Sequence, residues 1–465
     1  MDSIPSRFQG IVIPKDDPFK NDKLGYSKYS SVLKGMVDMY KDSGCVIAIS
    51  GKWGTGKTTF VQMWKASLPA KEYSTVYFNA WETDYFSDPL TAILGELKEI
   101  SQDSESFKTV CASLGKVALA AGGSALKGFI KKATGIDSDI VKDSVESVKS
   151  LFQENLEDYT QQKQSLVEFK QKLSEYVAGQ DGKPVVFIVD ELDRCNPHYA
   201  VKVLEVVKHL FDVPNICFVL AIDKKQLECS IKGFYGSSEI DAENYLRRFV
   251  DVEFIMPEPN IEGFTNLLYQ NYGFHEFFEG LNNTGNNPEE DFRRLATSLC
   301  RHFQLDLRTY DKVLAHTRLA YAQIGNETIL VEIVLLLSFL RITDPGFFND
   351  ISSHRFGVQE LLYEFERKLP NDLLVESDSD YTMRGTARLM VFTIVSLLML
   401  YDCLDGRSIE GVFNDVRKDA NLALKCSIIN KETLQEAAGW FGRRANPYYG
   451  LKNVLKIVNL LKQFQ

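Results

Sequence analysis

Five short apolar runs in the first 260 residues predict β-strands. They are Cys45–Ser50, Thr75–Phe78, Val185–Val189, Ile216–Ile222 and Val252–Met256. Most show no polar alternation, which is typical of a parallel sheet covered on both faces. Helical spacing of apolar residues appears before and between the runs, at 29–37, 58–65, 89–100, 166–177, 199–211 and 239–250. This order of strands and helices predicts an α/β fold.

The pattern changes after residue 260, where no run indicates a strand and long helical patterns continue to the end. We therefore predict a parallel α/β domain over residues 1–260, a helical lid over 261–345 and a C-terminal helical domain over 346–465. Residues 101–163 are mostly polar or small and are interpreted as a helical insertion. Residues 282–290 and 377–382 are expected to be loops.

The apolar run Leu389–Tyr401 has thirteen residues, too few to span a bilayer, so we expect a buried core helix. Residues 108–132 are rich in Ala, Gly and Ser but are interrupted by Lys116 and Lys127. A soluble insertion is the simpler interpretation of that segment. Contact with a membrane, from the cytoplasmic side, remains the alternative.

The bulk composition narrows the class of protein. The chain has 465 residues and a formal net charge of −10, which argues against general electrostatic binding of nucleic acid, although a local basic patch is compatible with it. The eight cysteines form no C-x-x-C pair, and with six scattered histidines they suggest no metal site. Residues 1–7 lack the apolar core of a signal peptide. We expect a cytoplasmic protein with reduced thiols.

The octet Gly51–Thr58 reads G-x-x-x-x-G-K-[ST], the phosphate-binding P-loop. An apolar strand precedes it and a helix follows, as the motif requires. Backbone N–H groups of such a loop surround phosphate oxygens, and the helix N-terminus adds partial positive charge. The predicted nucleotide-binding residues are Gly51, Trp53, Gly54, Thr55, Gly56, Lys57, Thr58 and Thr59. Lys57 would contact the β- and γ-phosphates and the Thr58 hydroxyl would ligate Mg²⁺.

Asp190 and Glu191 follow the third apolar run, at the carboxyl end of the expected strand. Ligands of open α/β sheets bind at that edge. Asp190 is therefore the expected Walker B aspartate in the Mg²⁺ shell, and Glu191 the group that orients and deprotonates an attacking water. The simpler alternative is a pair of solvated charges that end a strand.

Five further positions are candidates for polar roles near the nucleotide. Asp193 and Arg194 would either polarise the site or form a structural ion pair. Asp223 ends the fourth strand and is expected to sense the γ-phosphate, or else to cap the helix that begins near Lys224. Arg247 and Arg248 precede the fifth strand, where a neighbouring subunit's arginine enters the site of many assembling ATPases.

Arg308 begins a helix in the predicted lid, where it would close onto the γ-phosphate as a sensor. Surface ion pairs are the alternative for the arginines. A motif of this kind does not separate ATP from GTP.

These motifs resemble one family, the KAP P-loop NTPases. The likeness runs from residue 15 to about 340. It rests on Asp17-Pro18, Asp22–Gly25, a tryptophan inside the P-loop, Phe78–Trp81, the segment Asp190-Glu-Leu-Asp-Arg-Cys195, Tyr245–Val250 and Leu307-Arg308.

The resemblance implies an ASCE-type sheet with a helical lid, an ATP and Mg²⁺ cofactor set, and an insertion that carries transmembrane helices in many members. This chain has no convincing span there. The family often has Asp-Asp where this chain has Asp190-Glu191. It usually has Glu-Lys where this chain has Arg247-Arg248, so Arg248 is preferred as the finger.

Bacterial members are frequently linked to defence against phage, which implies such a role here. A homo-oligomer and a protein partner bound through the helical C-terminal region are expected.

Four functions compete on these grounds. The first is a Mg²⁺-dependent ATPase, favoured by Glu191 and a candidate finger. The second is a nucleotide-gated binding switch with little turnover, favoured by the large helical half. The third is a membrane-associated scaffold that uses residues 108–132. The fourth is a DNA-translocating motor, and the formal net charge of −10 weighs against it.

Overall fold

The computed structural model describes residues 12–85, 89–98, 106–110, 112–113, 155–179, 183–210, 213–280, 287–324, 331–374, 381–405, 426–429, 431–444 and 451–460. Several predictions fall outside these ranges: those for the N-terminal residues 1–7, most of the insertion 101–163, nearly all of the segment 108–132, and loop residues 282–286 and 377–380. The chain forms two compact units, Ile11–Pro259 and Asn260–Gln465. We call them the P-loop unit and the helical unit and describe each by itself.

The P-loop unit contains a five-stranded parallel sheet in the order β2-β3-β4-β1-β5. The strands are β1 (Cys45–Ser50), β2 (Ser74–Asn79), β3 (Val185–Asp190), β4 (Ile216–Ile222) and β5 (Val252–Ile255). All five predicted strands are confirmed, and so is the α/β class. The order places β1 and β3 on either side of β4, so the P-loop and the Asp190 segment leave the same edge of the sheet.

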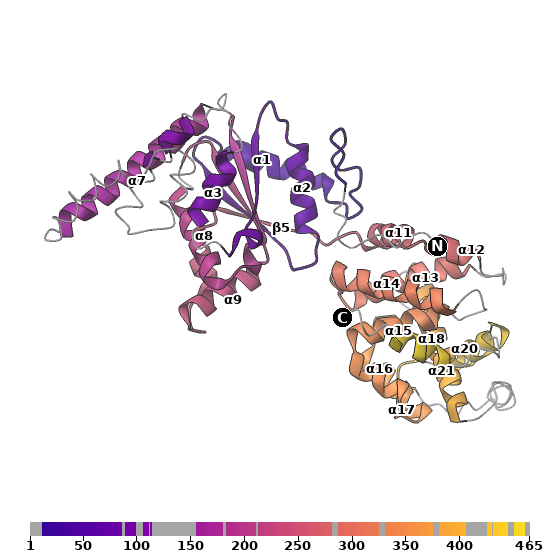
Figure 1. Ribbon diagram of the computed structural model, residues 1–465. Coiled ribbons are helices and arrows are strands. Elements are labelled where there is room, and N and C mark those ends of the chain that lie inside the picture. Colours follow the sequence, from indigo (N-terminus) through magenta and orange to yellow (C-terminus); the bar gives the residue numbers. More distant parts are fainter. Residues whose placement is uncertain are drawn as a thin grey trace. The chain divides into compact units, whose positions relative to one another are not determined.

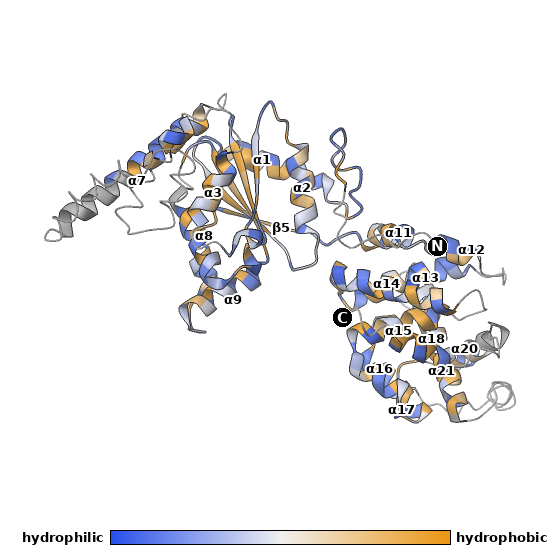
Figure 2. Cartoon of the chain, in the orientation of Figure 1, coloured by the Kyte–Doolittle hydropathy of each residue, from blue (hydrophilic) through white to orange (hydrophobic). Residues whose placement is uncertain are grey.

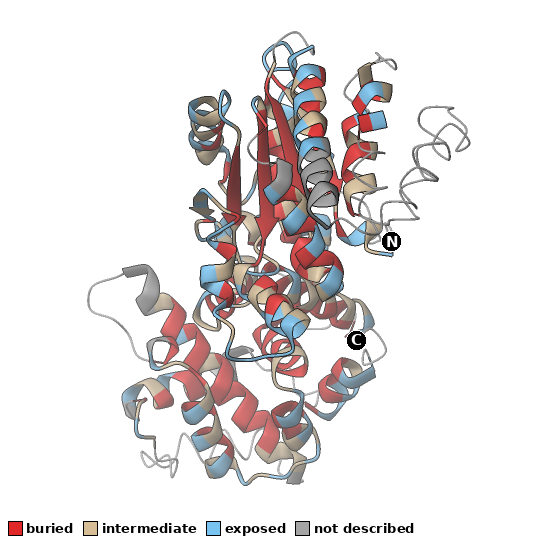
Figure 3. Ribbon diagram, turned by 90° about the vertical axis from the view of Figure 1, so that its left-hand side faces the viewer, coloured by how far each residue is buried: buried red, intermediate tan, exposed pale blue. Residues whose placement is uncertain are grey.

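Helices cover both faces of this sheet, as Figure 1 shows. Side chains alternate along β1: Cys45, Ile47 and Ile49 pack with α1 and α2, whereas Val46 and Ala48 face the core formed with α3, α7, α8 and α9. The strands are hydrophobic along most of their length (Figure 2), and most of the sheet is buried (Figure 3). β1, β3 and β4 are buried almost throughout, whereas the edge strand β5 is half-buried to exposed. Burial on both faces explains why the apolar runs show so little polar alternation.

The helices of the P-loop unit are η1 (Ser27–Tyr29), α1 (Ser30–Tyr40), α2 (Lys57–Ser67), η2 (Trp81–Thr83), α3 (Pro89–Lys98), α7 (Asn155–Ala178), η3 (Leu192–Arg194), α8 (Pro197–Leu210), α9 (Lys224–Tyr235) and α10 (Ala242–Leu246). The helix predicted over 239–250 is wrong in extent. Asp241 lies in a non-helical conformation and its side chain accepts a hydrogen bond from the Asn244 N–H, so the helix begins only at Ala242.

The described part of the helical unit is α-helical with short 3₁₀ turns. Its elements are α11 (Ile261–Asn271), α12 (Phe274–Glu279), α13 (Pro288–His302), α14 (Leu307–Ile324), α15 (Val331–Thr343), α16 (Pro345–Ser352), α17 (Val358–Lys368), η4 (Asn371–Leu373), α18 (Tyr381–Asp402), η5 (Cys403–Asp405), α20 (Lys431–Arg444) and α21 (Leu451–Leu460). One hydrophobic cluster joins helices on both sides of residue 345, including α13, α15 and α18.

The window Gly385–Asp402 of α18 is the one stretch in the described ranges that is long and apolar enough to cross a membrane. It is 72% buried inside the structure, and Met390, Ile394 and Leu397 are fully buried in the core of the helical unit. This helix therefore packs as a core helix, as predicted for Leu389–Tyr401.

Candidate functional site

The P-loop connects β1 to the N-terminus of α2 and wraps around the Lys57 side chain. Gly54 and Gly56 have φ angles of +76° and +86°, a region that favours glycine. A Cβ atom at Gly51 would lie 3.0 Å from the Thr55 hydroxyl oxygen and 3.1 Å from Met256 Cβ. The glycines of the motif therefore serve a tight turn and close packing, and they leave the loop backbone accessible to a bound group.

Lys57 is 92% buried, and its ammonium group donates to the carbonyl oxygens of Gly51 (2.7 Å) and Lys52 (3.1 Å). Burial lowers the pKa of Lys57, whereas the carboxylates of Asp193, Asp223 and Asp190 act in the opposite direction. The lysine charge therefore lies among acidic groups at the phosphate-binding loop.

Two tyrosines hold this region, and the sequence analysis identified neither. The Tyr26 hydroxyl donates to the Thr55 carbonyl oxygen over 2.8 Å, which fixes the loop from the segment before α1. The Tyr77 hydroxyl donates to Asp190 Oδ2 over 2.8 Å. Tyr77 stands two residues before Asn79 on β2, and Asn79 is in register with Asp190, so Tyr77 and Asn79 lie on the same face of the sheet. Only the pairing of β2 with β3 places Tyr77 near Asp190.

Asp190 ends β3 and is 1% exposed. Its Oδ1 atom accepts the backbone N–H of Glu191 over 2.8 Å. Burial raises the pKa of this carboxyl, and the hydrogen bonds from Tyr77, Thr58 and Glu191 oppose that rise. The Asp190 carboxylate and Thr58 hydroxyl offer the hard oxygen ligands that Mg²⁺ prefers, and a site with one carboxylate fits an ion completed by phosphate oxygens and waters.

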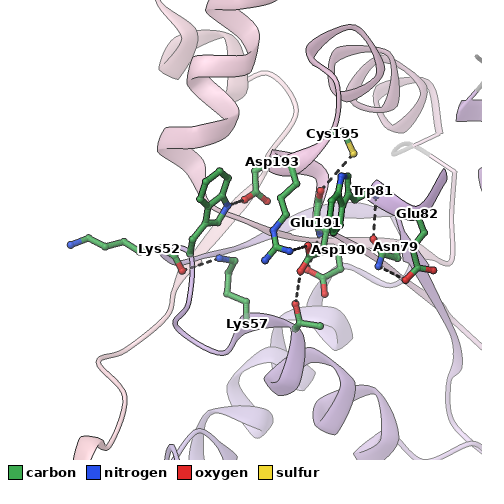
Figure 4. A network of polar contacts seen from close by, with 12 residues as sticks. Lys52, Lys57, Asn79, Trp81, Glu82, Asp190, Glu191, Asp193 and Cys195 are labelled. Atoms are coloured by element: carbon green, nitrogen blue, oxygen red, sulfur yellow. Dashed lines mark hydrogen bonds and ion pairs between the residues drawn. The ribbon is translucent and has the colours of Figure 1, made fainter. Parts of the chain in front are cut away.

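Glu191 lies beside the P-loop helix (Figure 4). Its φ angle is +62°, uncommon for a residue other than glycine. The Thr58 hydroxyl donates to Glu191 Oε1 over 3.2 Å, and the Arg194 guanidinium forms an ion pair with Oε2. Burial raises the pKa of Glu191 and the charge of Arg194 lowers it. The carboxylate that we expect to activate water is thus placed directly against the predicted Mg²⁺ ligand.

The acidic groups around the loop adopt pairings that the sequence left open. Arg194 pairs with Glu191 rather than with Asp193. Asp193 accepts the indole N–H of Trp53, and burial raises its pKa. Asp223 has two roles: its Oδ1 accepts the Gln226 N–H at the start of α9 over 3.3 Å, and its Oδ2 accepts the Trp53 backbone N–H over 2.9 Å. The helix cap is present, and the same carboxylate also holds the P-loop.

The structure thus brings together the P-loop, Asp190, Glu191 and Asp223. Within the described part of the P-loop unit, Arg247 and Arg248 make no hydrogen bond or ion pair with these groups. Arg247 forms an ion pair with Glu243 over 3.1 Å. Arg248 is exposed and has no ion pair within the described ranges. Arg308 is exposed at the start of α14 in the helical unit, where its N–H is accepted by Asp306 over 3.0 Å.

The chain is similar to one curated protein, the Phage T7 exclusion protein of Escherichia coli (strain K12), with 20% identity over 357 residues. That alignment covers 70% of this chain, and the chain spans only 45% of the relative's length. A solved structure, that of the Aeropyrum pernix ORC2 protein in ADPNP-ADP complexes, aligns over 94% of both chains with 12% identity and a TM-score of 0.34.

The model of the KAP family P-loop domain matches residues 26–396, well over half of the sequence. The match spans the P-loop, the Asp190-Glu191 edge and much of the helical unit. The chain therefore belongs to the KAP family of P-loop NTPases.

Proposed function

We propose that this protein is a Mg²⁺-dependent ATPase. The observation that carries the proposal is the convergence, at one sheet edge, of a buried Lys57, the Thr58 hydroxyl, the buried Asp190 and the Glu191 carboxylate. A phosphate cradle alone serves binding. A carboxylate in contact with Thr58, but separate from Asp190, adds a group that can accept a proton from water.

Each residue has a proposed role in that reaction. The P-loop backbone, with Lys57, binds and neutralises the phosphates, and the Tyr26 and Asp223 contacts hold the loop for them. Thr58 and Asp190 would hold Mg²⁺, which supplies charge neutralisation at the phosphates when bound. Glu191 orients the attacking water and takes up its proton. Asp223, which contacts both the P-loop and the start of α9, would report the γ-phosphate to that helix.

Steady-state phosphate release by the purified full chain tests the proposal. We expect Mg²⁺-dependent turnover that EDTA abolishes. If ATP binds but no phosphate is released with Mg²⁺ present, the chain is a nucleotide-gated switch instead. The separate helical unit, with its own core, is the feature that favours this alternative.

We further propose assembly into homo-oligomers in which Arg248 acts on a neighbour's site. Its exposure and its lack of an ion pair among the described residues support it over Arg247, which is bound to Glu243. Arg248→Ala should bind ATP normally and hydrolyse it more slowly. Mass measurement with and without ATP tests the assembly, and full activity of the variant in a strictly monomeric preparation would exclude a finger in trans.

The similarity to the Phage T7 exclusion protein supports a role in defence against phage, at the cytoplasmic side of the cell. The helical unit is the proposed binding surface for an effector chain. Plating efficiency of phage on cells with the wild-type chain or with Lys57→Ala tests this role, and equal plating on both strains would contradict it.

A further inference from the structure

We propose that Arg194 is a positioning residue that holds the Glu191 carboxylate in place for water activation, and that Trp81 holds Arg194. The inference rests on the proposed hydrolytic function and adds to it two residues from different strand ends. Figure 4 shows Trp81 and Glu191 in the surrounding network of polar contacts.

Arg194 lies between two partners. On one side its guanidinium is ion-paired with Glu191, and the two side chains are only 24% and 11% exposed. On the other side the guanidinium carbon lies 5.6 Å from the centre of the Trp81 ring. A guanidinium that stacks on an aromatic face and pairs with a carboxylate has little freedom to swing away.

The turn that follows β2, the strand paired with the Asp190 strand, fixes the position of Trp81. The Asn79 side chain accepts the Trp81 backbone N–H over 3.1 Å and donates to Glu82 over 2.8 Å, which shapes the η2 turn. The Ala80 N–H donates to the Asp190 carbonyl oxygen over 3.0 Å, so the turn is tied to the end of β3. Trp81 remains 51% exposed, so its ring is not explained by packing in the core. The cation–π contact gives this tryptophan a role.

The backbone of Glu191 also needs support, because its positive φ is disfavoured for a side chain of this type. The Arg194 N–H donates to the Glu191 carbonyl oxygen over 3.1 Å, so Arg194 holds both the backbone and the carboxylate of Glu191. A carboxylate has about four acceptor positions. The Thr58 hydroxyl occupies one at Oε1, and the Arg194 charge lies against Oε2, which leaves acceptor positions for a water molecule while the carboxylate stays fixed.

The test compares Arg194→Ala and Arg194→Lys in the full chain by kcat, KM for ATP and the pH profile of kcat. For Arg194→Ala we expect kcat to fall about tenfold or more with KM within about twofold, since a displaced general base loses catalysis rather than binding. The acidic limb of the profile should move to higher pH because the cation that favours the ionised carboxylate is gone. Arg194→Lys should recover part of kcat. The surface variant Arg367→Ala, which loses an ordinary ion pair with Glu364, is the control.

A double variant separates positioning from general stabilisation. In a Glu191→Gln background, Arg194→Ala should cause no further loss, because it acts through Glu191. Trp81→Ala should lower kcat and Trp81→Phe should lower it less, and these two carry the test if Arg194→Ala does not fold. An unchanged kcat and pH profile in Arg194→Ala, or an equal loss in the Glu191→Gln background, would overturn the inference.

The position of the Glu191 side chain keeps this result distinct from failure of the proposed function. A crystal structure of Arg194→Ala should show the Glu191 carboxylate displaced from its wild-type place beside Thr58. An undisplaced carboxylate refutes the inference even if the wild-type chain turns over ATP. A displaced carboxylate in the variant, with no ATP hydrolysis by the wild-type chain, refutes the proposed function and leaves Arg194 as the holder of Glu191.

Discussion

The Tyr77 hydroxyl provides a quantitative test of the charge state of the site. It donates to Asp190 Oδ2 over 2.8 Å, and Asp190 is 1% exposed. A buried carboxylate is compensated only by its hydrogen-bond donors and nearby cations. Tyr77→Phe removes one of these donors and changes little else in the shape of the side chain.

The size of the effect follows from the type of hydrogen bond. A bond to a charged acceptor contributes about 1.5–3 kcal/mol, and one between neutral groups about 0.5–1.5 kcal/mol. Tyr77 favours the ionised form of Asp190, so its loss raises the pKa of that carboxyl further. The free energy of unfolding should fall by about 1.5–3 kcal/mol at pH 7.5. The loss should shrink as the pH falls through the folded-state pKa of Asp190, which burial places above its usual 3.8.

Tyr26→Phe is the matched control, because the Tyr26 hydroxyl donates over the same 2.8 Å to a neutral acceptor, the Thr55 carbonyl oxygen. Its cost should be about 0.5–1.5 kcal/mol and independent of pH between 5 and 8. Urea unfolding followed by tryptophan fluorescence measures both. Trp53, Trp64 and Trp81 lie in the P-loop unit, and a Trp440→Phe background removes the fourth tryptophan, which belongs to the helical unit.

The two variants give a clear criterion. Equal, pH-independent losses in Tyr77→Phe and Tyr26→Phe would show that Asp190 is not a buried anion in the folded chain. The Mg²⁺-ligand assignment of Asp190 would then lose its physical basis.

Three further predictions concern the loop and the helical unit. Asp223→Ala should lower the free energy of unfolding by about 1 kcal/mol through loss of the α9 cap, and it should also weaken ATP binding. The control Asp241→Ala, which removes the α10 cap, should affect only stability. Equal ATP affinity in the two variants would contradict the P-loop role of Asp223. Burial and the charge of Arg341 lower the pKa of His316 to about 4, below its usual 6.5. The unfolded chain therefore binds the extra proton, and unfolding of the helical unit should become easier by about 1.4 kcal/mol per pH unit as pH falls from 6.5 to 4; an unaltered pH dependence in His316→Asn would refute this. Trp53→Phe removes the indole donor to Asp193 and should loosen the P-loop, seen as faster amide hydrogen exchange at residues 51–56, with no change in the exchange of α14.

The sequence predicted the fold well because its strongest signals were local. The central strands β1, β3 and β4 are apolar runs buried on both faces, and the glycines of the P-loop motif specify its turn. The extent of α10 was misjudged because an apolar periodicity over 239–250 does not register that Asp241 caps the helix. The strand order was out of reach, since it depends on which strands pair rather than on any one segment.

The sequence identified residues of the candidate site but not the contacts between their side chains. Asp190 and Glu191 were found from their place after an apolar run. No local pattern indicates that Arg194 pairs with Glu191, that Asp193 pairs with Trp53, or that Glu191 has a left-handed backbone. Tyr26 and Tyr77 act across 29 and 113 residues of sequence, so only the fold brings them to the loop and to Asp190.

Parallel measurement of ATP occupancy and phosphate release on three chains tests the central claim most directly. Wild type should bind ATP and release phosphate with Mg²⁺. Lys57→Ala should lose both, because in the proposed site the Lys57 ammonium neutralises the phosphates. Glu191→Gln should bind ATP as wild type does and release phosphate about 100-fold more slowly or worse. Equal phosphate release by wild type and Glu191→Gln, or unchanged ATP binding by Lys57→Ala, would contradict the account.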